Sequence, residues 1–353
     1  MRRILSLVVV FLVVCICLAV LIARKHQRQI TQSHFKTFPL VFDVEWGGDE
    51  TVCLLEQYSD SSQYRLVLTS PNRSKVLGTV AGLNAYSPDF SQILTAKQSG
   101  SDIGGHPEVY DLVKQKFITL GSDLIVTGSW YDNNTICYFT ALDMVNHPDE
   151  YELVFKPVSG RNPSLFNIPN GLVPGHILCL PQGTLVFNAV YLAKGPMDYL
   201  YTFNYGHCSP IIGTYGSGKF INRPKTYQVI VAQINNSWQT SSINTLDVST
   251  SPPTERSLIA TARFADLQQI TDMSFAADGN LLVITAQHHS SPDDNSIYLY
   301  DMRTDKLTEI AHGIQAKISP DGSQIVYIGS DEKTVFSCNI DGKDIRQLYS
   351  VVR

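Results

Sequence analysis

The chain has 353 residues, a length that suits one large domain or two smaller ones. Hydrophobic residues make up 44% and charged residues 17%, which provides enough apolar material for a substantial core. The net charge is −5 at pH 7, and no Lys/Arg-rich stripe occurs beyond the flanks of the N-terminal segment. This balance argues against nucleic acid as a partner.

The first predicted element is an apolar run of twenty residues from Ile4 to Ala23. At about 1.5 Å per residue a helix of this length spans about 30 Å, the thickness of a hydrocarbon core. A secretory signal usually has a shorter apolar region and a small-x-small cleavage site, whereas Leu21 occupies the −3 position relative to Ala23. We predict an uncleaved transmembrane signal anchor over 1–25 and a polar juxtamembrane stalk over 26–37, with a cleaved signal as the alternative.

The flanks of this segment do not decide its orientation. Arg2 and Arg3 precede the run, and Arg24, Lys25 and Arg28 follow it. The rule that basic residues stay on the cytoplasmic side therefore gives a tie.

After residue 37 the sequence repeats with a period of about 40 residues, and the last two copies are the clearest. Asp278 and Asp321 lie 43 residues apart, each precedes a glycine (Gly279 and Gly322), and each is followed by an apolar strand-like run. Glycine tolerates positive φ, and Asp accepts a hydrogen bond from the backbone two residues on, so these pairs predict tight turns. A second turn at Asp341-Gly342 closes the last hairpin.

Weaker copies of the same turn occur upstream. Asp49, Asp89 and Asp132 each precede a β-type run at similar spacing, with Phe90 in the place of glycine after Asp89. Pro181-Gln-Gly183 continues the series, and one further unit around 226–248 is harder to phase. The Asp and Gly residues of these turns are assigned a structural role because they recur in the same place.

Periods of 40–50 residues are typical of β-propeller blades. We therefore predict an all-β fold, a single propeller of about seven four-stranded blades over 38–353. A count of six stays open, because the first unit could serve only to close the ring. After residue 37 no long stretch keeps the 3.6-residue period of a helix. A two-sheet sandwich would not explain why the Asp turn recurs at the same place in each repeat.

The turn Ser319-Pro-Asp-Gly322, the apolar strand after it and the closing turn at Asp341-Gly342 resemble the TolB-type propeller repeat. The strong matches cover about a third of the chain. The resemblance implies an extracytoplasmic propeller that binds a protein or another ligand. The small α/β domain that usually precedes the propeller in TolB-like proteins is absent from this sequence, which argues against an actual TolB role. Similar repeats occur in the propellers of prolyl-oligopeptidase-type hydrolases and in oligogalacturonate lyases.

Motifs for nucleotide or serine chemistry are incomplete. Gly213 to Lys219 has the spacing of a phosphate-binding loop, but Phe220 stands where Ser or Thr must hold magnesium. Gly216-Ser-Gly218 lacks the full nucleophile elbow and has no α/β domain around it. We interpret this region as a loop between strands.

Histidines, acidic pairs and cysteines supply the remaining candidates. A lyase-like site in the central channel could use one of several histidines, and cation binding is conceivable at two acidic segments. Neither segment has the ligand spacing of a calcium loop. The histidines are His106, His147, His176, His207, His288 and His289, and the acidic segments are Asp102–His106 and Asp293-Asp294. The seven cysteines form no C-x-x-C pair; we interpret them as buried thiols, with one long-range disulfide left open.

These observations favour a membrane-anchored extracytoplasmic propeller that acts as a non-enzymatic binding scaffold for a protein or glycan, without a cofactor or catalytic residues. The propeller is expected on the extracytoplasmic side of the cell membrane. The alternative is a polysaccharide-active enzyme, similar to oligogalacturonate lyases, with its site in the central channel.

Overall fold

The computed structural model describes residues 40–47, 51–57, 64–98, 105–143, 147–191, 198–204, 206–211, 217–235, 237–290 and 295–351. These residues form 28 strands, joined in places by short 3-10 turns such as η1 (Pro181–Gly183) and η3 (Thr261–Arg263). The predicted all-β class is confirmed. The predicted anchor and stalk lie outside the described residues. Among the residues described, none forms a helix with the length and apolar character that crossing a bilayer requires.

The first half of the described chain forms four-strand units, each built from consecutive antiparallel strands. The first unit contains β1 (Leu40–Trp46), β2 (Val52–Gln57), β3 (Tyr64–Ser70) and β4 (Arg73–Val80). The next contains β5 (Gly82–Tyr86), β6 (Gln92–Gln98), β7 (Gly105–Asp111) and β8 (Lys116–Thr119). Then come β9 (Ile125–Asp132), β10 (Thr135–Asp143), β11 (His147–Pro157) and β12 (Ser164–Asn167).

The second half repeats the pattern. One sheet contains β13 (Leu172–Cys179), β14 (Leu185–Tyr191), β15 (Asp198–Asn204) and β16 (His207–Pro210). The next contains β17 (Ser217–Asn222), β18 (Gln228–Ile234), β19 (Thr240–Asp247) and β20 (Thr254–Ile259). The last two contain β21 (Leu267–Phe275), β22 (Leu281–His288), β23 (Ser296–Asp301) and β24 (Lys306–His312), and then β25 (Ile314–Ile318), β26 (Gln324–Ile328), β27 (Thr334–Asn339) and β28 (Arg346–Ser350).

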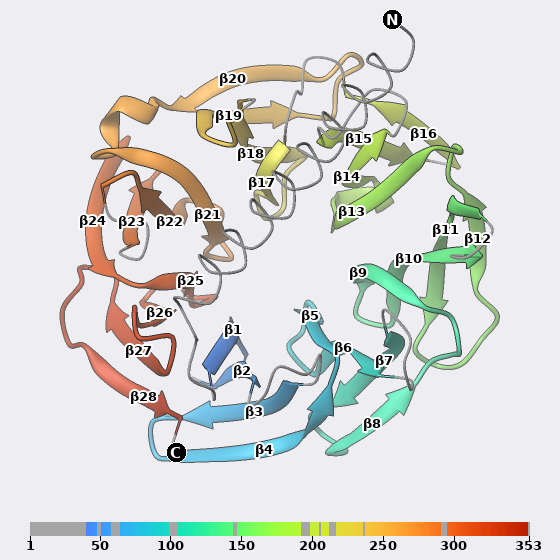
Figure 1. Ribbon diagram of the computed structural model, residues 1–353, viewed down its shortest axis with the longest axis horizontal. Coiled ribbons are helices and arrows are strands. Elements are labelled where there is room, and N and C mark those ends of the chain that lie inside the picture. The colour runs from blue at the N-terminus through green and yellow to red at the C-terminus, as the bar shows by residue number, and fades with distance from the viewer. Residues whose placement is uncertain are drawn as a thin grey trace, which may run out of the picture.

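The sheets stand around a common axis, so the fold is a β-propeller (Figure 1). In each unit the first strand is innermost and the fourth is outermost (Figure 1). Five of the sheets contain four strands each. The β5–β8 and β9–β12 units are joined in one eight-stranded sheet, in which Gly105 of β7 pairs with Ile125 of β9. The structure therefore differs from seven separate sheets at this one junction.

Burial within a unit follows from this arrangement. The second strands are packed on both faces, as in β22, where the residues from Leu282 to Ala286 are all buried. The outermost strands are exposed along much of their length, as in β4 and β20. Strands packed on both faces favour continuous apolar runs, which accounts for the apolar runs that follow Gly279 and Gly322 in the sequence.

The ring closes without exchange of strands between its two ends. The apolar cores lie between neighbouring sheets, and one of them joins Val44 and Leu54 of the first unit to Val326 and Val335 of the last. The backbone N–H of Val41 also donates a 2.8 Å hydrogen bond to the carbonyl of Glu332. The first unit is thus a complete four-stranded sheet and does not serve only to close the ring.

Candidate functional site

The Asp turns predicted from sequence connect the first and second strands of their units, except the Asp341-Gly342 turn, which joins the third strand β27 to the fourth strand β28. Asp321 is representative: its Oδ1 accepts hydrogen bonds from the Ser319 hydroxyl at 2.6 Å and from the Ser323 N–H at 3.1 Å. These bonds lower the pKa of the Asp321 carboxyl below its usual value. Gly322 follows with a φ of 75°, the left-handed conformation that glycine adopts most easily.

The other predicted turns show the same geometry where they are described. Asp89 accepts hydrogen bonds from Ser87 and Ser91, and Phe90 takes the glycine position with a φ of 58°. Asp132, Asp278 and Asp341 each accept a hydrogen bond from the backbone N–H two residues on. Gly279 and Gly342 have φ values of 71° and 77°. Asp49 lies outside the described residues.

A group of ionisable side chains lies on the innermost strands, and we call it the axial cluster. Its members come from five different units, on β1, β13, β17, β21 and β25, and interact electrostatically with one another. They are Asp43, Glu45, His176, Lys219, Asp272 and Lys317. A propeller brings residues together in this way because each unit contributes one strand to the axis.

Lys317 and Asp272 form the ion pair of the axial cluster. The Lys317 Nζ lies 2.9 Å from Oδ2 of Asp272 and donates a hydrogen bond of 3.1 Å to Oδ1, and the two side chains are only 16% and 15% exposed. Burial opposes the charge on Lys317, but the carboxylates of Asp272, Glu45 and Asp43 outweigh it and raise its pKa. Lys317 therefore remains charged.

Asp43 and Glu45 are half-buried carboxyls on β1, and the nearby cation Lys317 forms its ion pair with Asp272. Burial raises the pKa of Asp43 to about 6 and that of Glu45 to about 7, although nearby Lys317 opposes both shifts. Such carboxyls exchange protons near neutral pH, as general acids and bases do. The pair therefore has acid–base capacity.

His176 is the histidine of the predicted set that joins the axial cluster. Although His176 is exposed on β13, desolvation of its imidazole by the surrounding protein and the charges of Lys219 and Lys317 lower its pKa to about 4. The ring also makes an edge contact with Phe220, at 5.3 Å between centroids. His176 is therefore a neutral imidazole at physiological pH.

The other predicted histidines that are described lie apart from the axis. Nδ1 of His106 on β7 is 3.1 Å from the Asp123 carbonyl, and Nδ1 of His288 at the end of β22 is 2.5 Å from the Ala265 carbonyl. His207 begins the outermost strand β16, and His289 follows β22. The side chain of His147 and the segments Asp102–Gly104 and Asp293-Asp294 lie outside the described part of the chain. Within that part, no three His, Cys, Asp or Glu residues are placed to share a metal ion.

The phosphate-loop spacing does not lead to a phosphate site. Lys219 lies within β17, where a phosphate loop would need the start of a helix. Gly213 to Gly216 lie outside the described residues. The interpretation of this segment as a loop between strands is wrong at its described end, because Ser217, Gly218 and Lys219 form the start of β17.

A cavity of about 350 Å³ opens between the β9–β12 and β13–β16 units, and we call it the aromatic cavity. Its apolar walls are four rings in edge contact: Tyr131 and Phe155 are 5.1 Å apart, Phe155 and Phe166 are 5.7 Å apart, and Phe166 and Phe203 are 5.3 Å apart. Its other lining residues are neutral: Thr135, Ser164, Gln182, Gly183, Asn204 and Gly206.

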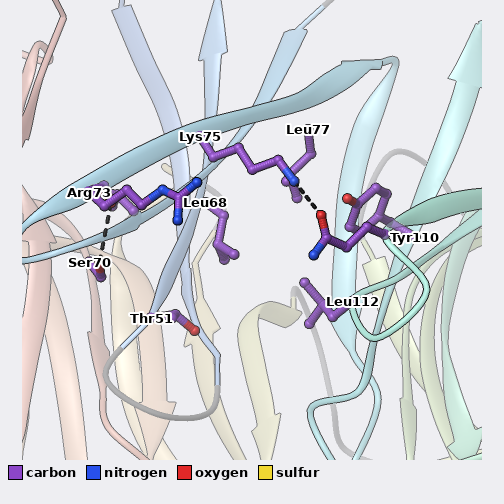
Figure 2. A pocket seen from close by; sticks show the side chains of 10 residues that line it. Thr51, Leu68, Ser70, Arg73, Lys75, Leu77, Tyr110 and Leu112 are labelled. Carbon is purple, nitrogen blue, oxygen red and sulfur yellow. Dashed lines mark hydrogen bonds between the residues drawn. The ribbon is translucent and has the colours of Figure 1, made fainter.

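A second cavity, of about 300 Å³, lies at the matching place between the β1–β4 and β5–β8 units. Figure 2 shows Arg73 and Lys75 of β4 on one side of it and Tyr110 and Leu112 on the other. Lys75 donates a 2.6 Å hydrogen bond to Gln115, which crosses between the two units. This cavity is thus lined by cations, in contrast to the uncharged aromatic cavity.

Sequence reasoning missed most of the axial cluster, although a signal was present. Lys317 lies two residues before the Ser-Pro-Asp-Gly turn, and Asp43, Glu45 and Asp272 lie in the corresponding runs before their own turns. These runs are the innermost strands. Charged residues in otherwise apolar first strands therefore mark side chains near the axis.

Comparison with known proteins finds similarity in structure alone. No family profile and no curated sequence matches the chain. The β-propeller domain of the Trilobed protease from Pyrococcus furiosus superposes with a TM-score of 0.64 at 11% identity, over 88% of this chain and 97% of that one. An oligogalacturonate lyase in complex with manganese gives 0.60 at 15% identity, over 88% and 86%.

A prolyl endopeptidase gives a TM-score of 0.62 at 12% identity over 90% of this chain. The chain spans about half the length of that enzyme, 49%. At these identities the likeness establishes the propeller fold and nothing about activity. The expected β-propeller is thus supported both by its own topology and by its structural neighbours.

Proposed function

We propose that this protein is a non-enzymatic binding propeller whose ligand is a neutral glycan held in the aromatic cavity. The observation that carries the proposal is the combination of four aromatic rings with neutral hydrogen-bonding side chains around about 350 Å³. Ligand sites are commonly concave and mostly apolar, with a few polar groups that fix orientation, and this volume is within their usual range.

A sugar ring matches this chemistry. Its C–H face is apolar and suits the faces of Tyr131 and Phe166, while its hydroxyls suit the amides of Gln182 and Asn204 and the hydroxyl of Thr135. All the lining side chains are uncharged. A neutral sugar therefore needs no desolvation of a charge to enter, whereas a charged one does.

Calorimetric titration of the purified full chain in detergent tests the proposal, with cellotetraose as the neutral probe and tetragalacturonate as the charged one. Cellotetraose should bind, and Tyr131→Ala should weaken the binding at least tenfold. Trp238→Ala removes an exposed aromatic ring elsewhere (55% exposed) and is the matched control. Binding that is absent, or that Tyr131→Ala leaves unchanged, would refute the aromatic cavity as the ligand site.

The carboxyl pair of the axial cluster favours a second candidate, a polysaccharide-active enzyme with its site at the axis. Glu45 has a pKa raised to about 7 by burial, the range in which a carboxyl can both give and take a proton. Release of products from tetragalacturonate, lost in Glu45→Gln and kept in Tyr131→Ala, would support this candidate. Absence of turnover in the wild-type chain would reject it for this substrate.

We also propose that the chain is tethered to a membrane by 1–25, with 26–37 as a stalk and the propeller on the extracytoplasmic side. The apolar run Ile4–Ala23, interrupted only by Ser6 and the mildly apolar Cys15 and Cys17, supports the tether. The full chain should sediment with membranes and be open to external protease, and removal of 1–25 should release it.

Lastly, because the β5–β8 and β9–β12 units meet through one residue pair, we propose to count them as two blades, which gives seven blades in total.

A further inference from the structure

Two cysteines from neighbouring units meet in the core. Cys137 lies on β10, in the middle of its sheet, and Cys179 is the last residue of the innermost strand β13. Their Sγ atoms are 3.1 Å apart, and both residues are free thiols. Forty-two residues separate them in sequence, so this contact exists only because the two units pack together.

The surroundings hold the two thiols in place. Cys137 is fully buried in the cluster that contains Phe187 and Phe203, and Cys179 packs against that cluster while half-buried. A disulfide has an S–S length of roughly 2.0 Å, so the sulfurs need to approach by only about 1 Å. The third cysteine at this cluster, Cys208, lies on the outermost strand β16.

We propose that Cys137 and Cys179 are a modification site, at which oxidation forms a disulfide that links the β9–β12 unit to the β13–β16 sheet. These are the two units that enclose the aromatic cavity. The proposal rests on the sulfur contact and does not depend on the proposed glycan.

The reaction is thiol–disulfide exchange with a disulfide oxidant such as oxidised glutathione. Cys179 is the more accessible thiol, so its thiolate attacks the oxidant, forms a mixed disulfide and releases one glutathione thiol. The Cys137 thiolate then attacks the Cys179 sulfur and expels the second glutathione. Two thiol protons and two electrons leave the protein, and one oxidant disulfide becomes two thiols. Burial raises the pKa of Cys137, so the second step is expected to be the slow one.

The test uses the purified full chain, fully reduced and then incubated with oxidised glutathione. Free thiols are alkylated under denaturing conditions without reduction, and the digested protein is analysed by mass spectrometry. We expect one cross-linked peptide containing Cys137 and Cys179, whereas Cys53, Cys208 and Cys338 are alkylated. The oxidised protein should melt roughly 5 °C or more above the reduced one, since the bond closes a long loop.

Two variants complete the experiment. Cys208→Ala should leave the cross-link intact, and Cys179→Ala should abolish it and leave Cys137 open to alkylation after unfolding. Should Cys179→Ala fail to fold, the mapping of the wild-type chain decides alone. Full alkylation of Cys137 and Cys179 after oxidation, or a cross-link to another cysteine, would overturn the proposal.

Discussion

The indole N–H of Trp46, on the first strand β1, donates a 2.9 Å hydrogen bond to the carbonyl of Lys317 on β25, which is 271 residues away. Trp130 on β9 makes the same contact with the carbonyl of Ala85 on β5, at 3.0 Å. Ala85 and Lys317 hold the same position, two residues before the serine of a Ser-Pro-Asp turn. The junction between the first and last units is therefore built like an internal one.

This equivalence predicts that Trp46→Phe and Trp130→Phe destabilise the protein by similar amounts. Each variant removes the indole donor from a part-buried carbonyl, which costs about 1 kcal/mol. Both tryptophans are 4% exposed, so the loss of buried apolar contact should also be similar in the two variants. Urea unfolding of the two variants checks this. A far larger loss for Trp46→Phe would show instead that the ring closure is a weak point.

Much of the fold could be predicted from the sequence because the turns are local. Asp89, Asp278 and Asp321 each bond the backbone within five residues, so their spacing reveals the repeat without any tertiary information. The junction of two units through Gly105 and Ile125 could not be predicted. It depends on how closely two sheets approach, and no local pattern encodes that distance.

The site was harder to predict because its residues come from different blades and meet only when the propeller is assembled. Asp43 and Lys317 are far apart in sequence, and each taken alone looks like a solvated charge on a strand. Cys137 and Cys179 lie on different units, and their contact follows from the packing of those units. The sequence suggested the cysteines as dispersed buried thiols, with a long-range disulfide left open, but offered no means of choosing a pair.

The turn aspartates lead to a prediction about stability. Asp321→Ala removes the acceptor for Ser319 and Ser323 and should cost on the order of 1 kcal/mol. Asp321→Asn keeps an oxygen at the same place and should cost less. Thermal unfolding at neutral pH compares the two, and equal losses would contradict the role of Oδ1 as the acceptor.

The axial carboxyls predict how stability depends on pH. Burial raises the pKa of Glu45 from about 4.5 to about 7, so the folded state binds a proton that the unfolded state has released between these values. The free energy of unfolding should therefore decrease as pH rises from about 4.5 to about 7 and then level off.

Glu45→Gln is neutral throughout and should remove part of this decrease, with a gain over wild type on the order of 1–2 kcal/mol at pH 8. For Asp43, the pH range over which its raised pKa lowers the free energy of unfolding ends earlier, at about 6, so the gain from Asp43→Asn should develop below that pH. Urea unfolding at pH 5 and pH 8 measures both effects. Parallel pH curves for wild type and Glu45→Gln would rule out the raised carboxyl pKa.

The last prediction concerns the wall of the aromatic cavity, where Gly183 and Tyr131 are in close approach. Gly183 has a φ of 79°, and a methyl group on it would overlap the Tyr131 hydroxyl. Gly183→Ala therefore adds a steric clash to backbone strain, whereas Gly160→Ala, with a φ of 82° and open space around it, adds the strain alone. We expect Gly160→Ala to cost about 1 kcal/mol and Gly183→Ala about 2 kcal/mol.

In a Tyr131→Ala background the clash is gone, so the cost of Gly183→Ala should fall to that of Gly160→Ala. The two changes should thus be non-additive by about 1 kcal/mol in a double-mutant cycle followed by urea unfolding. Additive losses would mean that Tyr131 moves aside freely. The ring would then not be held in place as a wall of the cavity, and the proposed glycan would lose the rigid surface on which it is expected to stack.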